Sequence, residues 1–407
     1  MGLRASGSAA TPVAGWKPPI APAADGGTVV ASRPAMSRLS VRRGASLAGD
    51  PAEALKEVQA AIDQPGSKAV LLFCSASYDL ASLGRLIRDA FPCPVIGCTS
   101  AGQIGAGGYQ QGGITAVSLA SDELCATPYL VSPIARSQES AAHAAAQVQT
   151  RLDASPTGWR GFGLLLADAM AAAEEGLVAS LYQSLGNVPI VGGSAGDDLR
   201  FERTSVYWDG QFVTGAAVFT VFETSLPFST FKLQHFRPTE KQLVTTSADP
   251  SVRLVREING IPAADAYAEL LGLTVDQLDP SVFSRHPVML RLGSDHYVRS
   301  IQKVNPDRSL TFYCAIDEGL VLSVGEGVDP LGTLEQGLRD ATADLGELSL
   351  VIGCDCVLRR LELEKRDVAR RAGEILSSYK VIGFSTYGEQ FNAVHVNQTF
   401  TGIALGG

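Results

Sequence analysis

The sequence predicts an α/β protein of the mixed α+β kind, with repeated strand–helix–strand units and an antiparallel sheet inserted before the last unit. Three observations predict this fold. Apolar runs of strand length alternate with helix-like stretches, the same order of elements occurs three times, and a hairpin-rich segment separates the second copy from the third. The repetition indicates that the glycine-rich turns within the units are equivalent corners of one architecture.

Each unit is expected to contain a strand, a helix, a second strand, a glycine-rich turn and a further strand. The first has a leading helix at 51–63, strands at 69–74 and 94–97 around a helix at 80–90, a turn at 97–102 and a strand at 114–119. The second has a strand at 162–167, a helix at 174–185, a strand at 189–191, a turn at 192–198 and a strand at 215–222. The third has a strand at 348–353, a helix at 358–377, a strand at 380–382, a turn at 383–389 and a strand at 396–405. Strands separated by one helix favour parallel pairing, which we expect in the first and third units.

The segment at about 228–328 has a different pattern. It contains strand-like runs at 242–246, 253–258, 288–292, 296–304, 310–315 and 320–324, and a short helix at 263–271. Asn259-Gly260 and similar dipeptides between these runs are typical of hairpin turns. The segment therefore predicts an antiparallel insertion, with a domain boundary near Pro227.

The composition is that of a globular protein, with 45% hydrophobic and 18% charged residues among 407. The net charge of −9 leaves no basic surface for nucleic acid. No apolar stretch is long enough to span a bilayer. Seven cysteines without a C-x-x-C pair indicate reduced thiols, and hence a cytoplasmic protein. Residues 1–48 are rich in Ala, Pro, Gly, Ser and Arg and are predicted to be disordered, with Met36 as an alternative start.

One motif suggests a serine hydrolase. Gly192 to Gly196 fits G-x-S-x-G, with Ser194 as the nucleophile. Such an elbow needs a helix directly after it, whereas the sequence continues to a hairpin centred on Asp209-Gly210. A hydrolase is therefore our third choice. Phosphate-binding loops, dinucleotide fingerprints and zinc-ligand spacings are all missing from the sequence.

Two of the five histidines have apolar and aromatic neighbours, His235 and His395. An axial haem ligand must be a neutral imidazole that faces an apolar pocket. Taken alone, each histidine is better explained as a hydrogen-bonded core residue, so the residues by themselves leave both roles open.

Three segments resemble the signatures of FIST proteins (F-box and intracellular signal transduction). They are Pro94 to Gly102, Val191 to Asp198, and the C-terminal run from Val381 to Gly402. The resemblance covers about 65–405. It implies a FIST N-domain at 65–227, a FIST C-domain at 228–386, and a closing signature with the final strand at 387–407.

The resemblance also implies a function. FIST proteins are expected to be non-enzymatic sensors of small ligands that signal to a separate histidine kinase or cyclic-dinucleotide protein. The segments 234–239, 297–304 and 354–360 are most similar to the branch that senses nitric oxide through haem. We therefore expect haem, with His235 or His395 as alternative iron ligands, and an amino-acid-like ligand as the second choice. The ligand pocket is expected at the turns, with these residues: Gly97, Cys98, Ser100, Gly193, Ser194, Asp197, Tyr387, Glu389 and Asn397.

Overall fold

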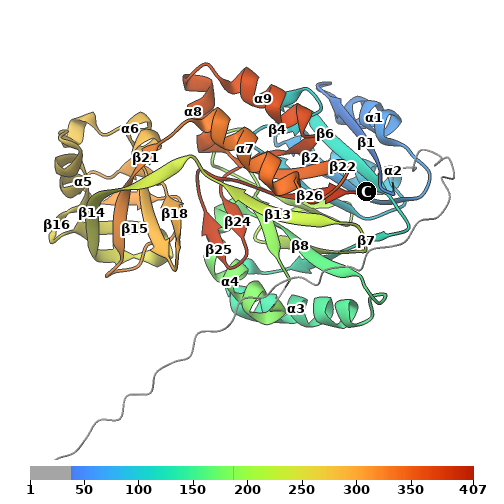
Figure 1. Cartoon of the computed structure of the whole chain (residues 1–407), viewed down its shortest axis with the longest axis horizontal. Coiled ribbons are helices and arrows are strands. Elements are labelled where there is room, and N and C mark those ends of the chain that lie inside the picture. Colours follow the sequence, from blue (N-terminus) through green and yellow to red (C-terminus); the bar gives the residue numbers. More distant parts are fainter. Residues whose placement is uncertain (1–37, 187) are drawn as a thin grey trace, which may run out of the picture. The chain divides into compact units, whose positions relative to one another are not determined.

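Three six-stranded sheets with the same internal order account for most of the fold, which is the mixed α+β type predicted (Figure 1). The computed structural model describes residues 38–186 and 188–407. The first unit comprises β1 (Ser40–Ser46), α1 (Pro51–Ile62), β2 (Ser67–Ser75), α2 (Leu80–Ala90), β3 (Val95–Ser100), β4 (Gln103–Gly105), β5 (Gly108–Gln110) and β6 (Ile114–Ala120). The second comprises β7 (Leu124–Val131), α3 (Ser137–Asp153), β8 (Arg160–Ala167), α4 (Glu174–Leu185), β9 (Ile190–Ser194), β10 (Val206–Trp208), β11 (Gln211–Val213) and β12 (Ala217–Thr224).

The third unit repeats this order around the insertion. It comprises β13 (Phe228–Leu233), α7 (Pro330–Thr342), β22 (Leu348–Cys356), α8 (Val357–Lys365), α9 (Ala369–Ser378), β23 (Val381–Thr386), β24 (Glu389–Phe391), β25 (Val394–Val396) and β26 (Phe400–Gly406). In each unit the two strands around the inner helix pair in parallel, as β2 with β3, β8 with β9, and β22 with β23. The parallel pairs predicted for the first and third units are confirmed.

The short hairpins are exchanged between units in a cycle. The hairpin β10–β11 of the second unit extends the first sheet, β24–β25 of the third extends the second, and β4–β5 of the first extends the third. Two of these contacts are glycine to glycine. A Cβ on Gly84 of α2 would lie 2.5 Å from the carbonyl oxygen of Gly210, and a Cβ on Gly108 would lie 2.8 Å from Cα of Gly373. Only glycine allows the hairpin and the host helix to approach so closely. The three units therefore depend on one another for complete sheets.

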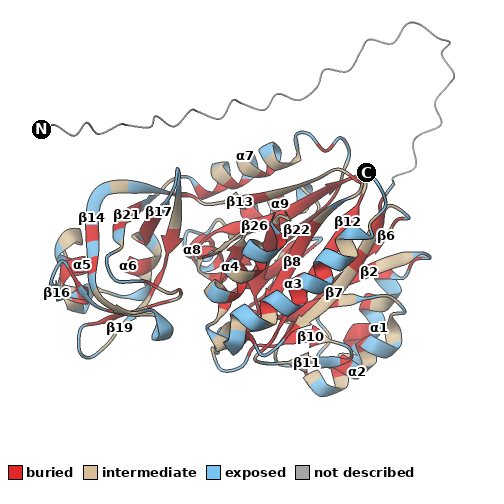
Figure 2. Ribbon diagram, turned by 90° about the horizontal axis from the view of Figure 1, so that it is seen from below, coloured by how far each residue is buried: buried red, intermediate tan, exposed pale blue. Residues whose placement is uncertain are grey.

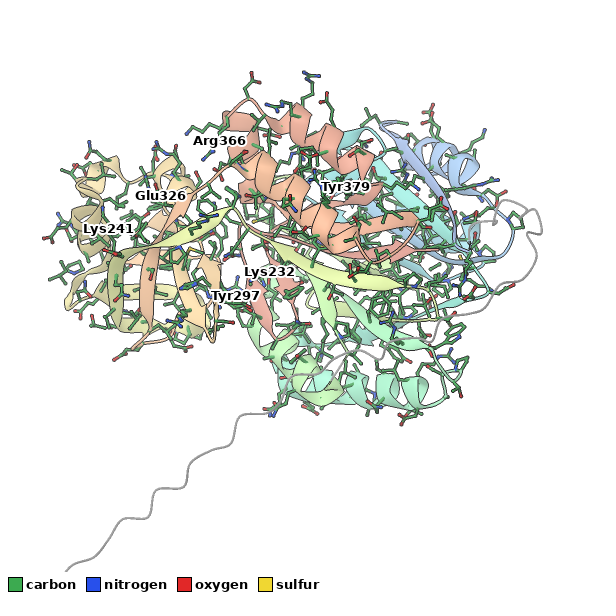
Figure 3. The ribbon with its side chains drawn as sticks, in the orientation of Figure 1. Lys232, Lys241, Tyr297, Glu326, Arg366 and Tyr379 are labelled. Carbon is green, nitrogen blue, oxygen red and sulfur yellow. The ribbon has the colours of Figure 1, made fainter. Side chains whose placement is uncertain are left out.

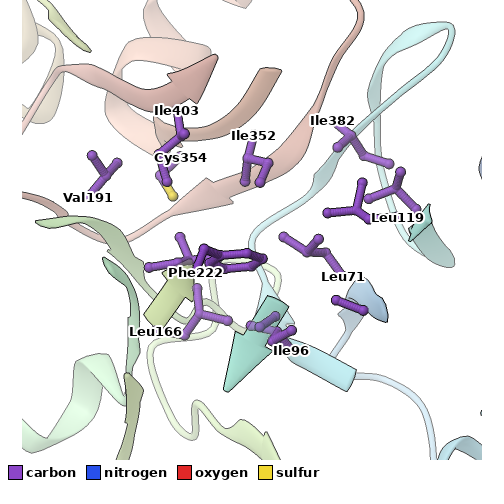
Figure 4. Close-up of a cluster of buried hydrophobic side chains, with 14 of the residues drawn as sticks. Leu71, Ile96, Leu119, Leu166, Val191, Phe222, Ile352, Cys354, Ile382 and Ile403 are labelled. Atoms are coloured by element: carbon purple, nitrogen blue, oxygen red, sulfur yellow. The ribbon is translucent and has the colours of Figure 1, made fainter. Parts of the chain in front are cut away.

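All three sheets turn one face toward a shared hydrophobic core (Figure 4). Leu71, Phe222 and Ile352 come from different sheets and belong to this one cluster. The opposite face of each sheet is covered by its own helices, α1 and α2, α3 and α4, or α7 and α9. Figure 2 shows the consequence, because the strands are mostly buried while the outward sides of α3 and α7 are exposed. Aspartates at 50, 79 and 329 accept hydrogen bonds from the first backbone amides of α1, α2 and α7, and so fix where these helices begin.

The insertion forms an eight-stranded antiparallel sheet with its own core, as predicted. Its strands are β14 (Phe236–Asp249), β15 (Leu254–Ile258), β16 (Ile261–Pro262), β17 (Val288–Leu292), β18 (Asp295–Arg299), β19 (Ile301–Val304), β20 (Leu310–Phe312) and β21 (Val321–Gly327), with helices α5 (Ala263–Leu271) and α6 (Pro280–Arg285). The chain enters and leaves through one neck, where the amide of Val328 donates to the carbonyl of His235 at 2.7 Å.

The structure corrects several expected elements. Residues 40–46, expected to be disordered, form β1, which pairs with β6 along its whole length; the rest of that expected extension up to residue 37, with Met36, lies outside the described residues. The single helix expected at 358–377 is two helices, separated at Asp367, which has a φ of 56°. The strand β7, the helix α7 and the hairpin β4–β5 were not expected. Within the described part of the chain, no helix is long and apolar enough to cross a membrane.

Candidate functional site

The turns of the three units meet at one point and bond to one another in a ring. Ala101 donates its amide to the carbonyl of Ser385 at 3.0 Å, and Gly196 donates to Thr99 at 3.0 Å. Tyr387 closes the ring, since its backbone amide donates to the carbonyl of Ser194 at 3.2 Å. Every turn both donates one of these bonds and accepts another. In each turn the donating residue comes two positions after the accepting residue, so the three bonds are equivalent. The structure therefore brings the predicted turns together.

Most of the residues predicted to line a ligand pocket at these turns instead pack in the interior. Cys98 belongs to the shared core, and Ser100, Ser194 and Glu389 are fully buried. A Cβ on Gly97 would lie 2.2 Å from the carbonyl oxygen of Leu72, so Gly97 allows two strands to approach. Gly193 has a similar role, because its Cβ would lie 2.8 Å from the ring of Phe384.

A buried polar network leads from the ring to the insertion. Ser194 donates its hydroxyl to Oε1 of Glu174 at 3.1 Å, and the side-chain amide of Gln390 donates to Oγ of Ser194 at 2.9 Å. The same amide lies 3.2 Å from Nδ1 of His395. With the amide as donor, Nδ1 is the acceptor and Nε2 of His395 carries the proton. The network joins α4, β9 and the hairpin β24–β25.

Two arginines of the insertion complete this network, and we call the whole set the junction: Glu174, Glu175, Ser194, Gln390, His395, Arg253 and Arg299. Nη2 of Arg253 lies 2.7 Å from Oε2 of Glu174 and 3.0 Å from Oε2 of Glu175. Arg299 donates from Nη1 to the carbonyl of His395 at 2.6 Å. The junction thus holds two cationic and two anionic side chains beside a histidine.

Burial and charge set the protonation states at the junction. Burial would raise the pKa of Glu175, but Coulombic attraction to His395, once that imidazole is protonated in acid, and to Arg253 outweighs burial. Together with an amide hydrogen bond from Ala315, this lowers the pKa of Glu175 to about 2. Burial lowers the pKa of His395, so its imidazole is neutral near pH 7. The formal charges of the arginines and glutamates therefore cancel.

Several buried polar atoms at the junction have no hydrogen-bond partner among the described residues. Three are donors, namely Nε2 of His395 and the Nε atoms of Arg253 and Arg299, and one is the acceptor Oε1 of Gln390. Nδ2 of Asn397, next to the junction, is also without a partner. Buried polar atoms are normally satisfied, since each unmade bond costs about 1–3 kcal/mol. Their concentration in one place marks the junction as the candidate ligand site.

A second contact joins the insertion to the third unit beside the junction. The ammonium of Lys232 on β13 lies 3.8 Å from the ring centroid of Tyr297 on β18, and Figure 3 shows the two side chains next to each other. A cation over an aromatic face is attracted by the ring quadrupole. This contact, together with the neck at His235, holds the insertion against β13.

Asp197, one of the predicted pocket residues, holds part of the backbone in place. Its carboxylate accepts the amides of Phe201, Glu202 and Arg203 at 2.7–2.8 Å, and the hydroxyl of Tyr387 at 2.5 Å. Burial would raise its pKa, but the Tyr387 hydroxyl and these amides outweigh burial and lower it. Asp197 therefore holds the loop at 198–203 against the ring of turns.

The surroundings of Ser194 do not form a nucleophile elbow. Its hydroxyl is fully buried, its partners are Glu174 and Gln390, and the strand β9 continues into a loop and then β10 rather than a helix. Oγ of Ser194 has no hydrogen bond to a histidine in the described structure. The geometry that G-x-S-x-G suggested is therefore absent at this turn.

The two histidines predicted as haem ligands lie apart and are both closely packed. Nε2 of His235 lies 2.8 Å from Oε2 of Glu362 on α8, and its ring lies 4.3 Å from that of Phe236. A Cβ on Gly388 would lie only 2.3 Å from Cε1 of His395. Neither histidine lines any of five prominent cavities in the described part of the chain. The packing in this conformation leaves no room for a porphyrin beside either imidazole, so the residues present do not fit haem here.

Sequence reasoning missed five junction residues, Glu174, Glu175, Arg253, Arg299 and Gln390. The adjacent glutamates at the start of α4 look like ordinary acidic residues of a first helical turn, which are common and exposed. Arg253 looked like one more residue of an insertion strand, although it has a φ of 55° in the structure. No local signal distinguishes these residues, because their partners are distant in sequence. Among the described residues no group of three His, Cys, Asp or Glu side chains could hold a metal ion.

Comparison with known proteins agrees with the signatures in the sequence. The family model described as the FIST N domain matches residues 68–261, and the FIST C domain matches residues 263–392. Uncharacterized protein MJ1623 of Methanocaldococcus jannaschii is 24% identical over 277 residues, 59% of this chain and 53% of that protein. The match thus spans about half the length of that relative.

Two solved structures show a weak likeness. A cyanuric acid hydrolase from A. caulinodans has 10% identity and a TM-score of 0.35, with 91% of this chain and 99% of that chain covered. Another, entitled "Cyanuric acid hydrolase: evolutionary innovation by structural concatenation", has 10% identity and a TM-score of 0.33, covering 91% and 100%. Both scores are too low to carry an argument. The two domain matches cover well over half of the sequence, and the chain belongs to the FIST family, with a FIST N domain followed by a FIST C domain.

Proposed function

We propose that this protein is a non-enzymatic sensor that binds a small zwitterionic, amino-acid-like ligand at the junction. FIST domains are associated with sensing in signal transduction, which supports the general role. The observation that carries the proposal is the concentration of unpartnered buried donors and acceptors beside side chains of both charges.

The charges at the junction favour a zwitterion over a simple ion. Because the two arginines and the two glutamates cancel, a buried ligand with net charge would be left without compensation. A zwitterion adds no net charge. Its carboxylate suits the free Nε–H groups of Arg253 and Arg299 and the Nε2–H of His395, and its ammonium suits Glu174 and Glu175.

Ligand binding at this place would change how the insertion sits on the repeat units. The ligand would take over bonds that Arg253 now makes to Glu174 and Glu175, which join the insertion to α4. A ligand with different affinities for the two arrangements shifts their populations. The partner that receives the signal, expected from the family to be a histidine kinase or a cyclic-dinucleotide protein, belongs to the same proposal.

Thermal unfolding with a panel of the common amino acids tests the proposal. At least one should raise the unfolding midpoint of the full chain, whereas its N-acetyl amide, which lacks both charges, should not. The shift should be lost in Glu175→Gln and kept in Glu139→Gln, which removes the same charge from an exposed residue on the neighbouring helix α3. Each shift is measured against the variant's own midpoint. If no amino acid stabilises the protein, the zwitterion proposal is wrong.

Haem, read out as nitric oxide sensing, is the second candidate. One observation favours it, since His235 and His395 each have one buried imidazole nitrogen without a partner, Nδ1 and Nε2 respectively. A bound haem would supply an iron that takes up nitric oxide, but the chain would first have to open around one of these imidazoles. Titration with hemin should then give a Soret band that shifts with nitric oxide and is lost in His235→Ala or His395→Ala. Absence of the band would remove this candidate and leave the zwitterion proposal untouched.

A further inference from the structure

Four arginines line one cavity that lies away from the junction. The cavity, which we call the arginine cavity, has a volume of about 800 Å³ and lies between α2, the turn of the β10–β11 hairpin and the loop at 198–203. Two arginines come from α2 and two from the loop: Arg85, Arg88, Arg200 and Arg203. The chain as a whole has a net charge of −9, so this local excess runs against the overall composition.

The acidic side chains of the arginine cavity do not neutralise these arginines. Asp79 accepts the amides of Ala81 and Ser82 at the start of α2. Asp197 is bound to three amides and to the hydroxyl of Tyr387. Glu202 alone has a carboxylate without a side-chain partner among the described residues. Asp79 and Asp197 are thus engaged by other groups, and Glu202 alone is left to oppose the four exposed arginine side chains.

The arginines themselves are largely unpaired. Arg88 has one loose ion pair, 3.4 Å to its exposed neighbour Asp89. Arg200 donates from Nε to the carbonyl of Asp197 at 3.1 Å, and its only ion pair among the described residues is a loose one, 3.7 Å to Asp198. Arg85 and Arg203 are exposed and make no ion pair within the described part of the chain. Unpaired guanidinium groups around one concavity attract oxyanions, which they bind through two parallel hydrogen bonds.

The walls of the arginine cavity are fixed. The carbonyl of Gly210 lies against Gly84, so α2 and the exchanged hairpin are in direct contact, and the side chain of Arg88 packs on Gly210. The loop is held by Asp197 although it contains Asp198, Leu199 and Phe201 at φ values of 57°, 68° and 55°. Non-glycine residues rarely adopt such values, and they persist only where the surroundings enforce them. The two loop arginines are therefore presented by a constrained backbone.

We infer that the arginine cavity binds a small polyanion with phosphate or carboxylate oxygens, at a site separate from the junction. The volume lies in the range of pockets for small organic ligands and exceeds what a single inorganic anion needs. Leu80 and Phe212 add apolar surface for the rest of such a molecule. The inference is independent of the zwitterion proposal, because it shares no side chain with the junction.

Calorimetric titration of the full chain with pyrophosphate, and in parallel with citrate, tests the inference at low ionic strength. At least one probe should bind, and the two arms tell phosphate from carboxylate recognition. The double variant Arg85→Gln/Arg203→Gln should weaken binding at least about tenfold, since charge-assisted hydrogen bonds are lost. The control Arg371→Gln, an exposed arginine on α9, should stay within about twofold of the parent protein.

Both outcomes can be read without ambiguity, because the two mutated side chains are exposed and the unfolding midpoint of the double variant should equal that of the parent. Binding that is lost equally in Arg371→Gln reflects the general charge of the protein and overturns the inference. So does the absence of binding by both probes. Either result at the arginine cavity leaves the thermal unfolding test of the junction unaffected.

Discussion

Nη2 of Arg253, in the insertion, lies 2.7 Å from Oε2 of Glu174, at the start of α4 in the second unit. Only 14% of the arginine side chain and 2% of the glutamate side chain are exposed. This pair ties the inserted sheet to the three repeated units, and Ser194 connects it to the ring of turns. The insertion is therefore held on the second unit in part by a buried ion pair, and under our proposal the ligand competes for these charged groups.

Removal of this arginine should be costly. Arg253→Gln leaves the buried Glu174 and the half-buried Glu175 without their cation, so we expect the free energy of unfolding to fall by about 3 kcal/mol. Chemical denaturation measures the loss. Arg308→Gln is the matched control, since Arg308 also lies in the insertion and pairs with Asp265 at 2.7 Å, but with 61% of its side chain exposed. The control should lose less than about 1 kcal/mol; equal losses would show that the Arg253 pair has no special role.

Protonation of Glu175 in acid should reduce the free energy of unfolding that the junction contributes. Its folded pKa is lowered to about 2, below the ordinary value of 4.5, so the stability it contributes is present above pH 4.5 and is lost as the pH falls toward 2. We expect the free energy of unfolding of the parent protein to fall over this interval more steeply than that of Glu175→Gln. Parallel curves for the two proteins would mean that the carboxylate is not held in its charged form.

His395 should act at a higher pH and in the same direction. Burial lowers the pKa of His395 in the folded protein below 6.5. As the pH falls below 6.5, the imidazole therefore binds a proton more readily in the unfolded chain than in the folded protein. Stability therefore decreases as the pH falls below 6.5. His395→Gln, which cannot titrate, should show a flatter dependence of stability on pH just below 6.5. A slope unchanged from the parent protein would contradict a buried neutral imidazole.

Gly388 should be sensitive to the smallest substitution. A Cβ there would lie 2.3 Å from Cε1 of His395, closer than packed atoms approach, so Gly388→Ala must displace the imidazole. We expect a loss of about 1–3 kcal/mol in the free energy of unfolding, as for overpacked interiors. Gly49→Ala is the control, because nothing lies within 4 Å of its Cβ position. If both variants are equally stable, His395 is not held where the structure places it.

The repeated units were predictable because their signals are local. Apolar runs and glycine turns located α2, α4 and α5 to the residue, and the parallel pairs followed from the helices between strands. The exchange of hairpins was not predictable, since β4–β5 and β24–β25 are short and pair with strands far away in the chain. The resemblance correctly indicated the family. It also implied a ligand pocket at the glycines of the turns, and in the structure Gly97 and Gly193 allow close packing.

The junction was only half predictable for the same reason. Ser194 and His395 belong to conspicuous motifs, whereas Arg253 and Arg299 acquire their role only through the placement of the insertion on α4 and β25. Whether a charged residue such as Arg253 or Arg299 is buried depends on partners far away in the chain, which a single sequence does not reveal.

Hydrogen exchange with and without the amino acid that most stabilises the full chain tests the central claim most directly. A zwitterion bound at the junction should slow exchange in three separate segments at once, around Arg253, across 299–315 and across 389–398, while α2 and α9 exchange as before. Protection confined to other elements, or none at saturating ligand, would contradict a ligand site at the junction.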